Sequence, residues 1–279
     1  MQSQIHSALE LSFAPVAVVR TNDKPENARQ FKERRWGCVM FMLAAAAAQG
    51  AQAVFDRSTY GCWGGGVGLG FGNQYKNFPG GEDGFCHFLS IGNAQSESGR
   101  QVGEQIKPHF GEDFYDDFMQ GERYQQSPQR VRQFIDELPI VDNPETYVVF
   151  KPLEQIAADA PSPEVVVFLG DMDQIAGLTI LANYHRPTND NVIFPYAAGC
   201  QSIGIHPFAE AQREQPRAVL GLNDISARLA LKRILKKDVL SFAVPYRLFQ
   251  EMEANVAGSF IERNTWRQLR ALTKKESGK

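Results

Sequence analysis

The chain is poor in cysteine and has no long apolar run. Four cysteines occur among 279 residues, and no two of them form the C-x-x-C pair that marks a structural zinc site. The most apolar window, residues 39–48, is about ten residues long, whereas a bilayer span needs about 20. The first residues lack the basic start, apolar stretch and cleavage site of a secretory signal. We therefore expect a cytoplasmic protein without a membrane span, in which the cysteines are thiols.

The chain also lacks a basic surface and the common nucleotide-binding motifs. Its formal net charge is −3, and the sequence contains no basic stripe long enough to neutralise a run of phosphates. The phosphate motifs G-x-x-x-x-G-K-S/T and G-x-G-x-x-G are both missing. We expect no nucleic-acid partner and a small molecule as the candidate ligand. The sequence does not indicate an oligomeric state.

Hydrophobic patterning predicts strands that alternate with helices. Apolar, β-branched runs predict strands at 15–20, 84–92, 147–153, 164–169, 191–196, 218–222 and 239–244. Helical patterns occur at 28–35, 38–49, 98–106, 127–138, 174–184, 246–255 and 261–272. This order predicts an α/β fold, a mixed sheet with packed helices. Residues 1–279 would form a single domain, as one compact unit or as two closely packed lobes that divide near 140–150.

Cys38 stands where a predicted helix begins. The segment CVMFMLAAAAAQG combines strong helix formers with Gly50 at the position just after the helix end. The unpaired amide groups and positive dipole end of a helix N-terminus stabilise a thiolate or an anionic ligand. Cys38 is therefore a candidate site residue. The structural alternative is a cysteine that packs beneath Trp36.

Residues 60–72 read YGCWGGGVGLGFG, which is too rich in glycine for an ordinary helix. We expect a loop whose backbone approaches another group closely. Three successive glycines allow positive φ angles and expose amide N–H groups, as backbone around an anion or cofactor requires. We take these three, Gly64, Gly65 and Gly66, as candidate cofactor-binding residues. A tight bend is the structural alternative.

Several segments occur in a recognisable order along most of the chain. They are PVAVV near the start, Cys38 before an apolar helix, Cys62 before the loop ending LGFG, KPL at 151–153, PEVVVFLGDMDQIAGL, AAGCQSIGIHP around Cys200, and LGLNDISAR ending at Arg228. In this order they resemble the uncharacterised bacterial and archaeal family called domain of unknown function 169, also labelled ArCR. The resemblance implies a mostly α/β unit in which Cys38, Cys62 and Cys200 recur. It implies no reaction.

The leading hypothesis is that Cys38, Cys62 and Cys200 bind an iron–sulfur cluster, of the 4Fe-4S type, with Cys86 as a fourth ligand. Thiolates are the usual ligands of such clusters, and a fold can gather them from distant segments. Three thiolates would leave one iron open to a substrate, whereas four would favour electron transfer or a structural role. Redox or cluster-dependent chemistry would follow.

Two other interpretations remain open. In one, a cysteine is a nucleophile; the helix start favours Cys38, with His87 or His206 as the base. In the other, the protein binds an anionic metabolite without a metal. The segment 64–72 would then shape the pocket, and Arg228 would clamp a carboxylate or phosphate. The structural alternative for Arg228 is a buried ion pair or a contact on a helix surface.

Asp171 and Asp173 follow the strand predicted at 164–169, which we take to be parallel to its neighbours. They would then lie at the edge of the sheet where α/β proteins often place ligands. Aspartates at such positions more often cap the next helix through its free N–H groups, and we assign them that role.

Overall fold

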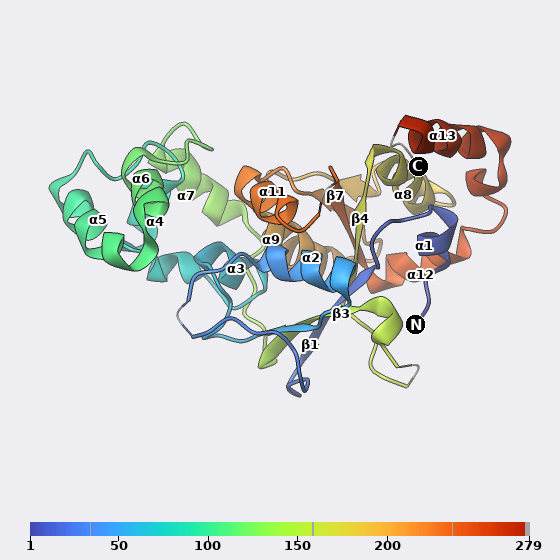
Figure 1. The fold of residues 1–279 in the computed structure, drawn as a ribbon, viewed down its shortest axis with the longest axis horizontal. Helices are drawn as coiled ribbons and strands as arrows, with labels where there is room; N and C mark the ends of the chain where they lie inside the picture. The colour runs from blue at the N-terminus through green and yellow to red at the C-terminus, as the bar shows by residue number, and fades with distance from the viewer. Residues whose placement is uncertain (34, 158, 236, 277–279) are drawn as a thin grey trace.

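A mixed sheet of seven strands runs through the middle of the computed structural model, which describes residues 1–33, 35–157, 159–235 and 237–276 (Figure 1). The strand order is β2-β3-β1-β4-β7-β6-β5. The strands are β1 Val16–Thr21, β2 Ala53–Phe55, β3 Tyr147–Pro152, β4 Val165–Gly170, β5 Val192–Ile193, β6 Ala218–Gly221 and β7 Leu240–Pro245. The predicted α/β class, a mixed sheet with packed helices, is confirmed.

Antiparallel pairing dominates the sheet. Only β5 and β6 pair in parallel among the described strands, while β4 is antiparallel to both of its neighbours, β1 and β7. The expectation that the strand before Asp171 is parallel to its neighbours is therefore wrong. Strands β3 and β4 do run in the same direction, but β1 lies between them. An apolar run indicates that a strand is buried and carries no information about its direction.

Helices cover both faces of the sheet. Their bounds are α1 Gln4–Ala8, α2 Val39–Gln49, α3 Trp63–Gly68, α4 Gly81–Phe88, α5 Glu97–Phe110, α6 Glu112–Gln120, α7 Pro128–Glu137, α8 Met172–Asn183, α9 Gly199–Ile203, α10 Ile205–Ala211, α11 Ile225–Lys232, α12 Tyr246–Ala254 and α13 Asn264–Glu276, with short 3-10 helices at Gln74–Asn77 (η1), Leu153–Gln155 (η2) and Phe260–Glu262 (η3). Because side chains alternate along a strand, β4 contributes to two cores. Val165 and Val167 pack on the side of α2, α9 and α11, whereas Val166 and Phe168 pack on the side of α1, α8 and α12.

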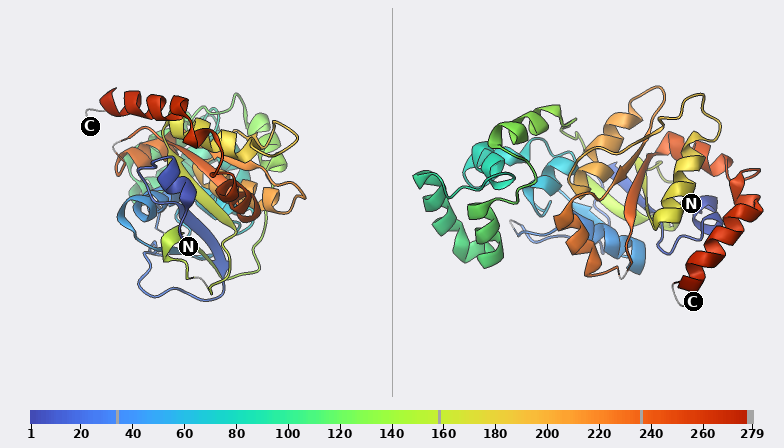
Figure 2. Two further views of the ribbon diagram at one scale, coloured as in Figure 1. Left: turned by 90° about the vertical axis from the view of Figure 1, so that its right-hand side faces the viewer. Right: turned by 90° about the horizontal axis from the view of Figure 1, so that it is seen from above.

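A helical lobe lies at one end of the molecule. Helices α4 to α7 gather there, and both termini lie at the opposite end (Figures 1 and 2). The lobe has its own core, in which Phe78, Phe85 and Phe118 are buried. In sequence the lobe falls between β2 and β3, which pair with each other. The chain therefore leaves the sheet, builds the lobe and returns to the same sheet.

Local signals predicted several helix boundaries. Helix α2 begins after its N-cap residue Cys38 and ends at Gly50, whose φ of 69° is left-handed. Helix α7 begins with Pro128 after Ser127, whose side chain accepts a hydrogen bond from the backbone of Arg130. Both arrangements follow from the residues that stabilise helix ends.

Three local predictions are wrong. The strand predicted at 84–92 is instead the end of α4 and the turn after it, because its large apolar residues follow the helical spacing and face the core of the lobe. The loop predicted at 60–72 contains the helix α3. The helix predicted at 28–35 is absent from the described part of that range, where Arg29 forms an isolated bridge with Ala53.

Candidate functional site

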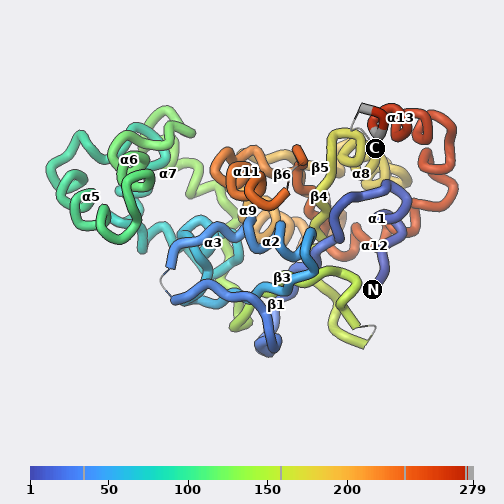
Figure 3. Tube along the Cα trace, viewed as in Figure 1, coloured from blue at the N-terminus to red at the C-terminus, as the bar shows by residue number. Residues whose placement is uncertain are grey.

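Three of the four cysteines lie at the beginnings of helices on one face of the sheet. Cys38 is the N-cap of α2, Cys62 is the N-cap of α3, and Cys200 lies in the first turn of α9. Helix α9 packs against both α2 and α3, in the middle of the molecule (Figure 3). We call this group of thiols the three-cysteine site.

Gly64 lies between two of the sulfurs. The Sγ atom of Cys200 donates a hydrogen bond to the Gly64 carbonyl oxygen at 3.0 Å. A Cβ atom on Gly64 would lie 3.9 Å from the sulfur of Cys200 and 4.0 Å from the sulfur of Cys62, with the hydroxyl of Tyr75 also at 3.9 Å. The backbone N–H of Gly65 donates to the sulfur of Cys62 at 3.3 Å. The backbone of Gly64 and Gly65 and the hydroxyl of Tyr75 therefore lie beside these two sulfurs.

The other glycines of α3 are needed for packing. A Cβ on Gly65 would lie 2.6 Å from the carbonyl oxygen of Tyr60, and a Cβ on Gly66 would lie 2.6 Å from the side chain of Gln74. Between α3 and α9, a Cβ on Gly204 would approach the carbonyl oxygen of Gly68 to 1.9 Å. Close packing against Tyr60, Gln74 and α9 explains why a segment so rich in glycine is helical. The close backbone approach predicted for this segment is present, but the group that the backbone approaches is another helix of the protein.

Asp224 joins the three-cysteine site from the beginning of α11. Its carboxylate accepts a hydrogen bond from the backbone N–H of Ala227, which caps α11, and another from the N–H of Gly199, which precedes Cys200. Both bonds are 3.2 Å long. Helix α11 also packs against α2, and a Cβ on Gly199 would touch both Ala227 and Met40. The carboxylate thus lies where α2, α9 and α11 meet.

Burial and negative charge together keep the three thiols protonated. Burial raises the pKa of Cys62 to about 12 and is also the largest cause of the raised pKa values of Cys38 and Cys200. The neighbouring cysteines and Asp224 raise the pKa values of Cys62 and Cys200 further, because each added negative charge opposes the next. Backbone hydrogen bonds act in the opposite direction at Cys62, where Gly65 is the largest such donor. The thiols and Asp224 therefore share one electrostatic environment.

Cys86 lies in the helical lobe, apart from the other three cysteines. It belongs to α4 and is fully buried among the aromatic side chains of the lobe core. Burial raises the pKa of its thiol to about 11, and the charged groups that act on it are Arg132 and the carboxylates of the lobe. Since none of the other cysteines is among those groups, we leave Cys86 out of the three-cysteine site.

Arg228 is held by groups of the protein. Its guanidinium donates to the carbonyl oxygens of Leu222 and Val239 and lies 3.4 Å from the carboxylate of Asp238. Of the two structural alternatives for Arg228, these contacts correspond to the helix-surface contact, because the ion pair with Asp238 is largely exposed and not buried.

Asp171 caps α8 as predicted, whereas Asp173 lies in the first turn and bonds to side chains of α13 instead. Asp171 forms a capping box with Gln174, and both Asp171 and Asp173 pair with Arg270 of α13. This cluster ties the C-terminal helix to the end of β4.

Neither candidate base contacts a thiol. His87 lies on α4 in the helical lobe, beside Cys86 in the sequence. His206 lies on α10, where burial lowers the pKa of its imidazole. No hydrogen bond joins either imidazole to a cysteine in the described part of the chain.

A group of polar side chains beside Asp224 was not predicted from the sequence. Its members are Glu122, Tyr124, Tyr196 and Ser226. Ser226 donates to Glu122 at 2.9 Å and contacts the hydroxyl of Tyr124 at 3.3 Å. Burial raises the pKa of Glu122 to about 7, and burial with the charge of Asp224 raises the pKa of Tyr196. The segment NDISAR, with an aspartate just before a helical pattern, could have predicted Asp224 as the N-cap of α11. Nothing in the local sequence predicts that Ser226 contacts Glu122 and Tyr124, which come from the helical lobe.

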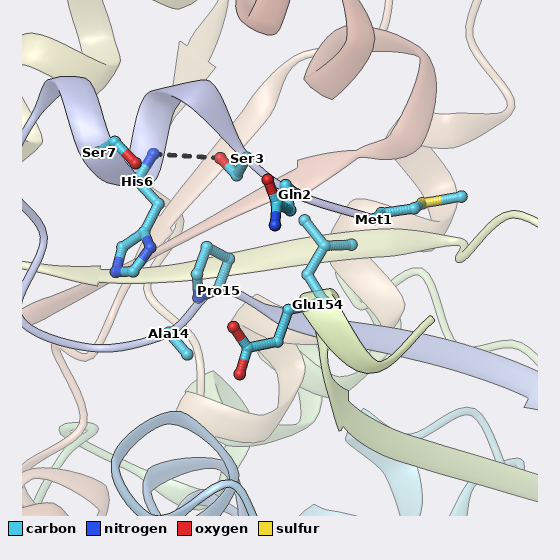
Figure 4. A pocket seen from close by; sticks show the side chains of 9 residues that line it. Met1, Gln2, Ser3, His6, Ser7, Ala14, Pro15 and Glu154 are labelled. Carbon is cyan, nitrogen blue, oxygen red and sulfur yellow. Dashed lines mark hydrogen bonds between the residues drawn. The ribbon is translucent and has the colours of Figure 1, made fainter. Parts of the chain in front are cut away.

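One groove lies away from the three-cysteine site. A groove of about 250 Å³ runs between α1 and η2, and Figure 4 shows His6 and Glu154 among the side chains that line it. Ser3 at its rim is already used, because it caps α1 and donates to Glu253. The groove contains no cysteine and adjoins none of the predicted site residues.

The fold and site together define an α/β protein with a mixed sheet and a partly buried group of three cysteines and one aspartate. Residues 4–255 match the family model described as uncharacterised ArCR, domain of unknown function 169, and the chain belongs to this family, as its segments predicted. No curated protein and no solved structure matches it.

Two further observations concern metals and membranes. In the described residues, no three His, Cys, Asp or Glu side chains are grouped as the ligands of one metal ion would be. Every helix of that same part of the chain is too short or too polar to span a membrane.

Proposed function

We propose that Cys38, Cys62 and Cys200 bind an iron–sulfur cluster of the 4Fe-4S type, and that the protein carries out redox or cluster-dependent chemistry in the cytoplasm. The observation that supports this most is the position of Gly64. At Gly64 no side chain projects between the sulfurs of Cys62 and Cys200, whereas any other residue would place a Cβ atom 3.9 to 4.0 Å from both.

The residue types fit such a group. Thiolates are the usual ligands of iron–sulfur clusters. Each thiolate of a cluster binds a different iron, so the proposal does not require three ligands around one ion. The N-terminal end of α2 at Cys38 and the N–H of Gly65 near Cys62 would stabilise negative charge on sulfur. A bound cluster would supply one-electron transfer or, at an iron without a thiolate, a Lewis-acid position.

The protonation state of the thiols sets a condition on loading. Because the pKa of each thiol is raised, the metal-free protein holds these three protons at neutral pH. Iron binding would release them, as coordination by cysteine requires the thiolate. The same raised pKa values argue against the alternative in which Cys38 acts as a nucleophile at neutral pH.

Anaerobic reconstitution with iron and sulfide tests the proposal. We expect about four irons and four sulfides for each wild-type chain, and loss of most of this iron in Cys38→Ala, Cys62→Ala and Cys200→Ala. Cys86→Ala is the matched control, since it removes a buried thiol outside the site, and it should keep its iron. A colourless wild-type protein, or equal iron loss in the control, would contradict the proposal.

A further inference from the structure

We propose that Asp224 is the fourth protein ligand of the three-cysteine site and binds the iron that Cys38, Cys62 and Cys200 leave without a thiolate. This inference rests on the proposed function. It names a residue that the cysteine pattern does not contain, and it replaces Cys86 as the fourth group.

Geometry places the carboxylate beside the cysteines. The Oδ2 atom of Asp224 accepts the N–H of Gly199, the residue directly before Cys200. The helix that Asp224 caps packs against α2, which begins after Cys38. A Cβ on Gly199 would be 2.8 Å from Ala227 and 3.0 Å from Met40, so the three helix starts are in direct contact.

The charge of Asp224 has no counter-ion within the described residues. No ion pair to this carboxylate occurs there, and its negative charge acts on all three thiols and on Tyr75. Two backbone N–H groups and the N-terminal end of α11 stabilise this charge, and no side-chain cation in the described residues adds to them. Iron at this position would supply a positive charge.

The carboxylate also has the capacity to bind a metal while it remains a helix cap. Each oxygen accepts one backbone N–H, at 3.2 Å, and a carboxylate offers about four acceptor positions in all. Carboxylate oxygen is an established type of ligand for iron.

Two substitutions at Asp224 distinguish its proposed role as an iron ligand from its role as the N-cap of α11. Asparagine caps helices as well as aspartate does, so Asp224→Asn can keep the bond from Ala227 while it loses the bond from Gly199 and the charge. We expect it to fold like the wild type by circular dichroism. Asp224→Cys offers a thiolate in place of the carboxylate. Asp171→Asn is the matched control, because Asp171 also caps a helix but lies against Arg270 on α13.

After anaerobic reconstitution and mild oxidation with ferricyanide, we expect Asp224→Asn to hold about three irons instead of about four. The 4Fe-4S cluster in its 2+ state would give one electron to ferricyanide and release the iron without a protein ligand as Fe²⁺, which leaves the electron paramagnetic resonance signal of a three-iron cluster. Asp224→Cys and Asp171→Asn should keep about four. Four irons and an unchanged Mössbauer spectrum in Asp224→Asn would overturn the inference and leave the proposed function intact. A wild-type protein that takes up no iron would remove both. If Asp224→Asn fails to fold, a three-iron Asp224→Cys protein would equally overturn the inference.

Discussion

The thiol of Cys200 donates a hydrogen bond to the carbonyl oxygen of Gly64 at 3.0 Å, across 136 positions of the chain. This contact fixes α9 against the first turn of α3, where Cys62 is the N-cap. Any metal that binds Cys200 would replace the proton that makes this bond. The state of the three-cysteine site is therefore linked to the contact between the two helices.

Gly64→Ala tests the space between the sulfurs. The new Cβ would sit at 3.9 to 4.0 Å from its nearest neighbours, which is ordinary contact, and alanine in a helix is favoured over glycine by up to about 1 kcal/mol. We expect stability equal to or above that of the wild type in urea unfolding, together with less iron after reconstitution. Unchanged iron content would mean that the space is not used.

Gly66→Ala is the control for that substitution. Its Cβ would lie 2.6 Å from the side chain of Gln74 and 3.0 Å from the ring of Tyr60. Overpacking of this kind costs about 1–3 kcal/mol, so this variant should unfold at lower urea concentration. The two alanine variants differ by two positions in one helix and should shift stability in opposite directions.

Alkylation of the metal-free protein should be slow at neutral pH. Since the pKa of Cys62 is about 12 and that of Cys86 about 11, few thiolates exist below pH 9. We expect iodoacetamide labelling, followed by mass spectrometry, to become appreciable only above pH 9. In guanidinium chloride the four cysteines should react at similar rates. One cysteine that reacts rapidly at pH 7 in the folded protein would revive the nucleophile alternative.

Glu122 should make the stability of the metal-free protein depend on pH. Burial raises its pKa from 4.5 to about 7, so the folded state holds a proton that the unfolded state releases as the pH rises above 4.5. This contribution is complete below pH 4.5 and is lost as the pH rises through 7. At pH 8, Glu122→Gln should exceed the wild type in free energy of unfolding by about 2 kcal/mol, after allowance for partial exposure.

At pH 4.5 that difference should nearly vanish, because both forms of the side chain are then neutral. Urea unfolding at the two pH values measures it. Glu26→Gln, at an exposed loop position, should show no such change between pH 4.5 and 8. Equal differences for the two variants would show that Glu122 titrates normally.

Arg270→Ala should loosen the C-terminal helix. The Arg270 side chain is 9% exposed and pairs with Asp171 and Asp173. Since both carboxylates are partly exposed, we expect a loss of about 2 kcal/mol in the free energy of unfolding, below the value for a fully buried pair. Arg267→Ala, on the exposed side of the same helix, should cost less than about 0.5 kcal/mol. Similar losses for both would argue against the ion-pair cluster.

The sequence predicted the elements whose signals are local. Helix α2 could be placed because Cys38 and Gly50 bound a run of strong helix formers, and the cap at Asp171 followed from its position after a buried strand. The order of the family segments also predicted membership correctly. The two helix signals reside in a few consecutive residues, and the family signal lies in the order of segments along the chain, so no tertiary contact is needed to interpret either.

The remaining features depend on contacts between distant segments. Helix α3 forms although it contains three successive glycines, because Tyr60, Gln74 and α9 leave no room for side chains. The direction of β4 is set by β1 and β7, which come from opposite ends of the chain. The position of Asp224 beside Cys200 likewise arises only when α11 packs against α2.

Glycines fix the distance between α3 and α9. Where Gly204 meets the carbonyl oxygen of Gly68, main chain touches main chain, and there is no side chain whose rotamer could widen or narrow the gap. A substitution can remove a thiol or crowd it, but no small change of side chain can alter the distance between the cysteines of α3 and α9. Any ligand of both cysteines would therefore have to fit a distance that the backbone fixes.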